Sequence, residues 1–139
     1  MVSVELKFKF FDVENVEEMQ RILDMSPEYS QEAEKLPNYL HWARLQLGEA
    51  RAYVAKMDVM VKKVEAELYQ RYRATAEQIG QKVTEKMLEA KIRTDENYIK
   101  AKLQLIQARE YEEKVEALYQ ALLTKAQILS SLMKAMYGN

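Results

Sequence analysis

Cations and tyrosines are concentrated between residues 62 and 93 of this 139-residue chain. The stretch holds eight Lys and Arg side chains against five Glu, a formal net charge of +3. Cations that follow a phosphate backbone and aromatic rings that stack on bases together suit sequence-tolerant binding of a single strand. Tyr69 and Tyr72 are three residues apart, so a helix would place them on one face. The candidate nucleic-acid-binding residues are Lys62, Lys63, Tyr69, Arg71, Tyr72, Arg73, Lys82, Lys86, Lys91 and Arg93.

The same residues also have an ordinary structural interpretation. Both tyrosines could lie in a core or an interface, where aromatic rings are common. The cations could form ion pairs with carboxylates in the same stretch, and the candidates for that role are Glu65, Glu67, Glu77, Glu85 and Glu89. The residue types and their spacing leave both interpretations open.

Catalysis and cofactor binding have little support in the sequence. His41 is the one histidine, there is no cysteine, and no His and carboxylate set has metal-ligand spacing. The three glycines stand apart, so there is no phosphate-binding loop. A run of carboxylates between residues 110 and 116 is interrupted by Lys114 and fits a solvated helix face. We expect a protein that is not an enzyme and that uses no cofactor or metal.

The composition also bears on the compartment. The absence of cysteine fits a reducing cytosol. No apolar run approaches the roughly 20 residues that span a bilayer, and the N-terminus lacks the pattern of a signal peptide. We expect a cytoplasmic protein with no membrane association.

A long helix is predicted to carry the first part of the basic stretch. Apolar residues recur every seven positions, at Leu40, Leu47, Val54, Val61 and Leu68, and a second set follows three positions later, at Ala43, Ala50, Met57, Val64 and finally Arg71. This heptad pattern is typical of a coiled coil, and it fails at Arg71. We expect the helix to run from Asn38 to Ile79 and to stop at Gly80.

Two further helices are predicted beyond Gly80. Thr84 is a candidate N-cap for a short helix ending near Ile92, and Thr94, followed by Asp95 and Glu96, is a candidate cap for a long final helix. The final helix repeats apolar residues at Ala101, Ala108, Val115, Leu122, Leu129 and Met136, with Tyr111, Leu118 and Leu132 three positions on and interruptions at Gln104 and Lys125. The two long helices would pair as an antiparallel hairpin.

Apolar residues outside these seams point to self-association. They include Trp42, Tyr53, Val59 and Met60 on the first long helix, and Leu103, Ile106, Ile128 and Met133 on the last. One hairpin cannot bury both sets, so we expect hairpins to pack on one another in a homo-oligomer.

The N-terminal third is acidic, with four basic and nine acidic side chains in residues 1–38. Alternation from Val2 to Phe10 predicts a single β-strand, which either pairs with another subunit or a partner or lies as an arm on the helices. Asn15 and Glu18 form a capping box for a helix over 16–24. Ser26-Pro27 predicts a second short helix ending near Lys35, and Leu36-Pro37 marks the next start.

We therefore expect an all-α, oligomeric chain with one N-terminal strand. Residues 1–12 form the strand or arm, 13–36 the short acidic helices, and 37–139 the long hairpin, in one domain overall.

The order of residues along the hairpin resembles UvsY-type recombination mediators of tailed bacteriophages. The resemblance is carried by Tyr39-x-x-Trp42, Leu68-Tyr69 and Tyr72, then Leu88-x-Ala90, Asp95 and Tyr98, and finally Ala121-Leu122, Lys125 and Ile128. It covers roughly residues 39–137 and is a matter of pattern and spacing. The segment before residue 39 does not match, and a strand at Val2–Phe10 is not expected in that family.

The resemblance implies a function. Such mediators bind single-stranded DNA, the recombinase and the single-strand-binding protein, and they help the recombinase to load. They act as ring-like homo-oligomers, are not enzymes, and would work in the host cytoplasm. Their basic element lies late in the first long helix, where this chain reads Val64-Glu65-Ala66-Glu67 and carries its cations on either side. The alternative is a phage structural or assembly protein that oligomerises through its hairpin.

Overall fold

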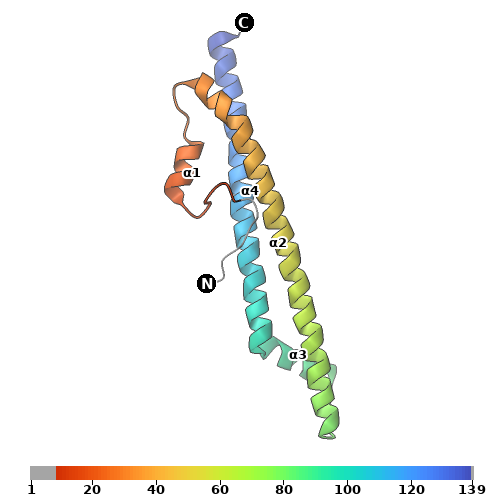
Figure 1. The fold of residues 1–139 in the computed structure, drawn as a ribbon. Helices are drawn as coiled ribbons and strands as arrows, with labels where there is room; N and C mark the ends of the chain where they lie inside the picture. The colour runs from red at the N-terminus through yellow and green to blue at the C-terminus, as the bar shows by residue number, and fades with distance from the viewer. Residues whose placement is uncertain (1–8, 139) are drawn as a thin grey trace. The chain divides into compact units, whose positions relative to one another are not determined.

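The computed structural model describes residues 9–138, and Figure 1 shows their fold. Four helices make up most of this range: α1 (Val16–Leu23), α2 (Tyr29–Gln78), α3 (Glu85–Thr94) and α4 (Glu96–Tyr137). Residues 9–138 contain no strand, so the all-α prediction is confirmed for this range. The contacts divide the chain into two compact units, the α3 unit (residues 53–109) and the α1 unit (residues 9–52 and 110–138). Each unit is described by itself below.

In the α3 unit, α2 packs against α4 through the predicted seams. Met57 and Val61 of α2 form a buried cluster with three residues of α4, namely Ala101, Leu105 and Ala108. Four of these five are heptad positions, and Leu105 is an added core residue. The heptad pattern on α2 ends where it was expected to end, since Arg71 is exposed.

Residues close together in sequence end α2 and begin α3. Gly80 has a φ of 71°, in the left-handed region that glycine adopts without steric cost, and the amide of Gln81 donates to Ala76 O over 2.9 Å. The hydroxyl of Thr84 then accepts from the amide of Met87 over 3.2 Å and caps α3. The predicted stop at Gly80 and the predicted cap at Thr84 are both confirmed.

In the α1 unit, α2 and α4 run antiparallel. Leu36 and Ala43 cluster with α4 residues between 118 and 129, whereas Leu47 and Ala50 cluster with Tyr111 and Val115. Residue numbers on α4 therefore fall as those on α2 rise. This register confirms the predicted hairpin packing.

The segment before α1 is held to the hairpin by Gln46, which is fully buried. The Oε1 atom of Gln46 accepts from the amides of Phe10 and Phe11 over 3.0 and 2.9 Å. Its Nε2 atom donates to Phe11 O over 2.9 Å and to the Tyr111 hydroxyl over 2.8 Å. One side-chain amide thus does for this segment what a neighbouring strand does in a sheet. The predicted strand falls mostly on residues 1–8, outside the described residues, and Lys9 and Phe10 have no regular secondary structure.

The end of α1 is held by Lys125, the interruption in the α4 seam. Its side chain is 5% exposed, and its Nζ atom donates to Ile22 O and Asp24 O over 2.8 and 2.9 Å and pairs with Glu32 Oε2 at 2.7 Å. Burial by itself would raise the pKa of Glu32, but the hydrogen bond from Lys125 and further favourable interactions hold that pKa below its ordinary value. All three ammonium hydrogens of Lys125 therefore have acceptors.

Two predicted helix boundaries were wrong. We expected one helix to end near Lys35 and another to begin after Pro37, but α2 begins at Tyr29 and runs through Pro37. Proline inside a helix removes a hydrogen bond and costs about 3 kcal/mol. Burial of Leu36, which is 6% exposed in the core of the α1 unit, opposes that cost.

The cap of α4 was also misplaced. Thr94 is the last residue of α3, and its hydroxyl donates to Ala90 O over 3.1 Å. Asp95 occupies the cap position instead, and its Oδ1 atom accepts from the amides of Asn97 and Tyr98 over 2.8 and 3.4 Å. A carboxylate at this position also complements the positive end of the helix dipole.

Candidate nucleic-acid interface

All ten predicted binding residues lie in the α3 unit. Six are on α2: Lys62, Lys63, Tyr69, Arg71, Tyr72 and Arg73. Three are on α3, namely Lys86, Lys91 and Arg93, and Lys82 lies in the loop between α2 and α3. The fold therefore gathers the basic stretch into one unit, although its members differ in what they contact.

The two tyrosines are engaged within the unit. The hydroxyl of Tyr69 donates to Glu85 over 2.8 Å and accepts from Arg73 Nη1 over 3.1 Å. The hydroxyl of Tyr72 donates to Asp95, and this bond raises the pKa of Tyr72 and lowers the pKa of Asp95. Both hydroxyls link α2 to the segment that follows it, which supports the structural interpretation of the tyrosines.

Several of the cations have carboxylate or aromatic partners. Lys62 pairs with Asp58 at 3.1 Å, and Arg73 and Arg93 pair with Glu77 and Glu89, each at 3.5 Å. The Nζ atom of Lys91 lies 5.6 Å from the centre of the Tyr72 ring. The three ion pairs are solvent-exposed, and such pairs contribute only about 0–1 kcal/mol. A phosphate can therefore replace these carboxylates at little cost.

Four of the predicted cations are exposed and have neither an ion pair nor an aromatic partner within residues 9–138: Lys63, Arg71, Lys82 and Lys86. Together with Lys91, whose partner is the neutral ring of Tyr72, they carry the charge of the basic stretch that no carboxylate among the described residues pairs with. They make the α3 unit the best candidate for a polyanion-binding surface in the part of the chain that the structure describes.

A groove of about 290 Å³ lies between α2 and α4 in the same unit. Arg71 is on the α2 side, and Asn97, Lys100 and Gln104 are on the α4 side. The sequence pattern did not indicate Asn97 or Lys100 as site residues, and it marked Gln104 only as a seam interruption. The signal that could have found them is the antiparallel register, because positions that oppose residues 60–71 fall between 97 and 104.

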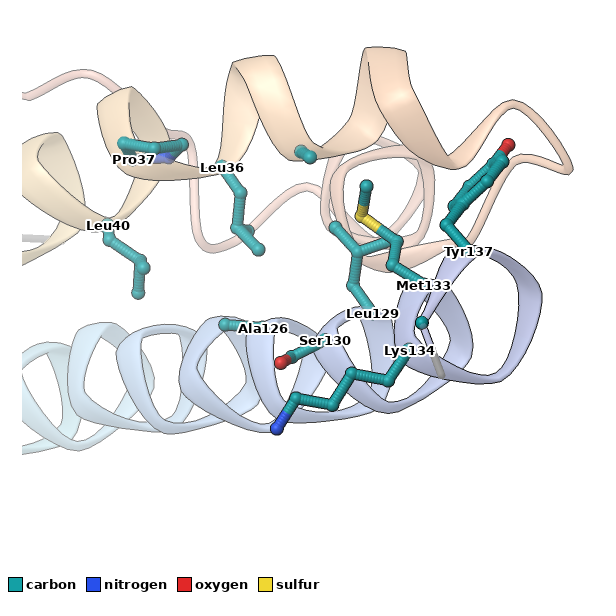
Figure 2. Close-up of a pocket in the computed structure, with 11 residues that line it drawn as sticks. Leu36, Pro37, Leu40, Ala126, Leu129, Ser130, Met133, Lys134 and Tyr137 are labelled. Carbon is teal, nitrogen blue, oxygen red and sulfur yellow. The ribbon is translucent and has the colours of Figure 1, made fainter.

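A second groove, of about 570 Å³, lies in the α1 unit and has a different character. Figure 2 shows Leu36 and Leu40 of α2 facing Leu129 and Met133 of α4, while the amine of Lys134 points away from them. This lining offers aliphatic surface and no cation directed inward. It suits apolar side chains and not a polyanion, so the α3 unit remains the candidate for a nucleic-acid interface.

Metal clusters and membrane-spanning helices are not found among residues 9–138. No group of three or more His, Cys, Asp or Glu side chains there could hold a metal ion. None of the described helices is both long enough and apolar enough to cross a membrane.

No family model matches this sequence, and no curated protein or solved structure matches it either.

Proposed function

We propose that this protein is a recombination mediator that binds single-stranded DNA through the α3 unit and assists the loading of a recombinase. The observation that carries the DNA-binding part is the set of exposed cations with neither an ion pair nor an aromatic partner among the described residues, Lys63, Arg71, Lys82 and Lys86. The mediator part is supported by the resemblance to UvsY-type proteins. The partners would be single-stranded DNA, a recombinase, a single-strand-binding protein and further copies of this chain.

The mechanism follows from charge and multiplicity. Each cation that reaches a phosphate releases condensed counterions, so binding is driven by entropy and weakens with salt. Copies of the α3 unit in a homo-oligomer would touch one strand at several points, which raises the overall affinity above that of a single unit. A strand held in this way is shared with the single-strand-binding protein, whose displacement by the recombinase becomes easier.

Fluorescence anisotropy with a labelled oligo-dT strand, titrated with salt, tests the DNA-binding part. We expect the logarithm of affinity to fall linearly with the logarithm of salt concentration. The triple variant Lys63→Gln, Lys82→Gln, Lys86→Gln should reduce that slope by about 0.7 for each phosphate that is no longer neutralised, roughly 2 in total.

The matched control is Lys35→Gln, Arg44→Gln, Lys134→Gln, which removes three exposed cations from the α1 unit. It changes the net charge equally and should leave the slope near that of the wild type. Equal reductions of the slope in both triple variants would show a general charge effect and would reject the α3 unit as the binding surface.

The second candidate is a structural or assembly protein that oligomerises through its hairpin. It is favoured by Ile99, Leu103 and Ile106 on α4, which are 44%, 53% and 46% exposed and fall at i, i+4 and i+7 on one helix face. This interpretation predicts a stable oligomer by light scattering and no salt-sensitive binding of oligo-dT. The anisotropy titration therefore separates the two functions.

A further inference from the structure

We propose that the groove between α2 and α4 of the α3 unit binds one nucleotide of the bound strand. Its phosphate would lie between Arg71 and Lys100, and its base would lie on the apolar floor beside Asn97 and Gln104. This inference rests on the proposed DNA binding and names a site within it. Arg71 and Gln104 are two of the positions at which the apolar seams are interrupted.

The floor of the groove is apolar and closed. Leu68 and Ala101 are 2% and 8% exposed, so they form a buried base, and the more exposed Met60 and Val64 flank them. Small-ligand sites combine such a floor with a few polar groups, in volumes of about 300–1,000 Å³. At about 290 Å³, this groove lies just below that range and has room for at most one nucleotide.

The charge of the groove favours an anion. Arg71 and Lys100 supply two cations, against one carboxylate from Glu67. Neither cation forms an ion pair within residues 9–138, although the Arg71 charge adds to the dominant Tyr72 hydrogen bond in lowering the pKa of Asp95.

The amides of Asn97 and Gln104 give the groove a way to recognise a base edge. Neither side chain has a hydrogen-bond partner among the described residues, so each offers both a donor and an acceptor. An amide that can donate and accept pairs with the edges of different bases, which fits sequence-tolerant binding. A base must be unstacked and unpaired before it can enter such a groove. The groove would therefore make the protein prefer single strands over duplexes.

The test compares oligo-dT with an abasic strand of the same length, using anisotropy on the full chain at one salt concentration. The abasic strand keeps its phosphates and has no bases. The wild type should bind oligo-dT about tenfold more tightly than the abasic strand, because only a strand with bases can bury apolar surface on the floor of the groove. Asn97→Ala with Gln104→Ala should remove most of that difference.

A second variant tests the two cations that would hold the phosphate. Arg71→Gln with Lys100→Gln should weaken binding of both strands and lower the salt slope by about 0.7, because one phosphate is no longer neutralised. The amide control is Gln120→Ala with Gln127→Ala, two exposed glutamines on α4 in the α1 unit, and it should match the wild type. Unchanged helical content by circular dichroism would show that each variant is folded.

The outcomes separate this site from the proposed function. If the wild type binds oligo-dT with salt sensitivity but both groove variants behave like the wild type, the groove is not a nucleotide site and the function stands. Equal wild-type affinity for oligo-dT and the abasic strand would overturn the role of the base. If the wild type binds neither strand, the groove assignment and the DNA-binding function both fail.

Discussion

The α1 unit and the α3 unit use polar residues in their helical seams in opposite ways. In the α1 unit, Lys125 interrupts the α4 seam and is buried with three acceptors around its ammonium group. In the α3 unit, Arg71 and Gln104 interrupt the seams, and their side chains have no hydrogen-bond or ion-pair partner among the described residues. A polar seam residue with every bond made holds the fold together. A polar seam residue whose side chain has no partner within the protein is available to bind a ligand.

The largest effect that would sharpen this comparison is expected from replacing Lys125. Lys125→Met keeps most of the side-chain volume but leaves Glu32 and two backbone carbonyls without their donor. Breaking a buried ion pair from one side costs about 3–5 kcal/mol. We expect a decrease of that size in the free energy of unfolding by urea, with Lys134→Met, at an exposed position, changing stability by less than about 0.5 kcal/mol. A decrease below about 1 kcal/mol would mean that Lys125 does not hold α1 in place.

A smaller effect should follow from pH. The pKa of Glu32 is lower in the folded chain than its ordinary value of 4.5, so its pairing stabilises the fold above that value. The contribution is lost as the pH falls through the lower, folded-state pKa. Between about pH 6 and pH 3, the wild type should lose more stability than Glu32→Gln, measured by urea unfolding at each pH. Parallel curves for the two proteins would contradict this assignment.

The smallest effect is expected in the α3 unit, at the bond between Tyr72 and Asp95. Tyr72→Phe removes a hydroxyl from a partly exposed site, where such a bond contributes about 0.5–1.5 kcal/mol. Thermal unfolding should register that decrease in stability, while oligo-dT affinity should stay within about twofold of the wild type, because this hydroxyl is already engaged. A large decrease in affinity with little change in stability would move Tyr72 from a structural role to a binding role.

Much of the fold follows from local patterns in the sequence. The heptads predict both long helices and their antiparallel packing, and Gly80 and Thr84 predict where α2 ends and α3 begins. These signals can be recognised in the sequence because each involves residues that lie close together in the chain. The error at Pro37 shows the limit, since a local helix breaker was opposed by burial of Leu36 in a core built from distant residues.

The site was less predictable than the fold. The stretch with unpaired charge was found from composition, but the partners of Tyr69 and Tyr72 lie 16 and 23 residues away and depend on how α3 turns back. Lys100 and Asn97 become candidates only once the register of α2 against α4 is known. Gln46 gave no signal either, because its partners are 35 and 65 residues away.

The hydrogen bonds of Gln46 with the N-terminal segment involve only backbone atoms of Phe10 and Phe11. Hydrogen bonds to backbone atoms do not depend on which side chains the segment carries. The attachment does depend on the register of the segment. A shift by one residue in one direction would put Lys9 where Phe10 now stacks on Trp42 at a centroid distance of 5.4 Å. A shift in the other direction would put Asp12 where Phe11 is buried. The link between this segment and α1 should therefore tolerate insertions and deletions poorly. In this part of the chain, the number of residues is constrained as well as their identity, since Asn15 caps α1.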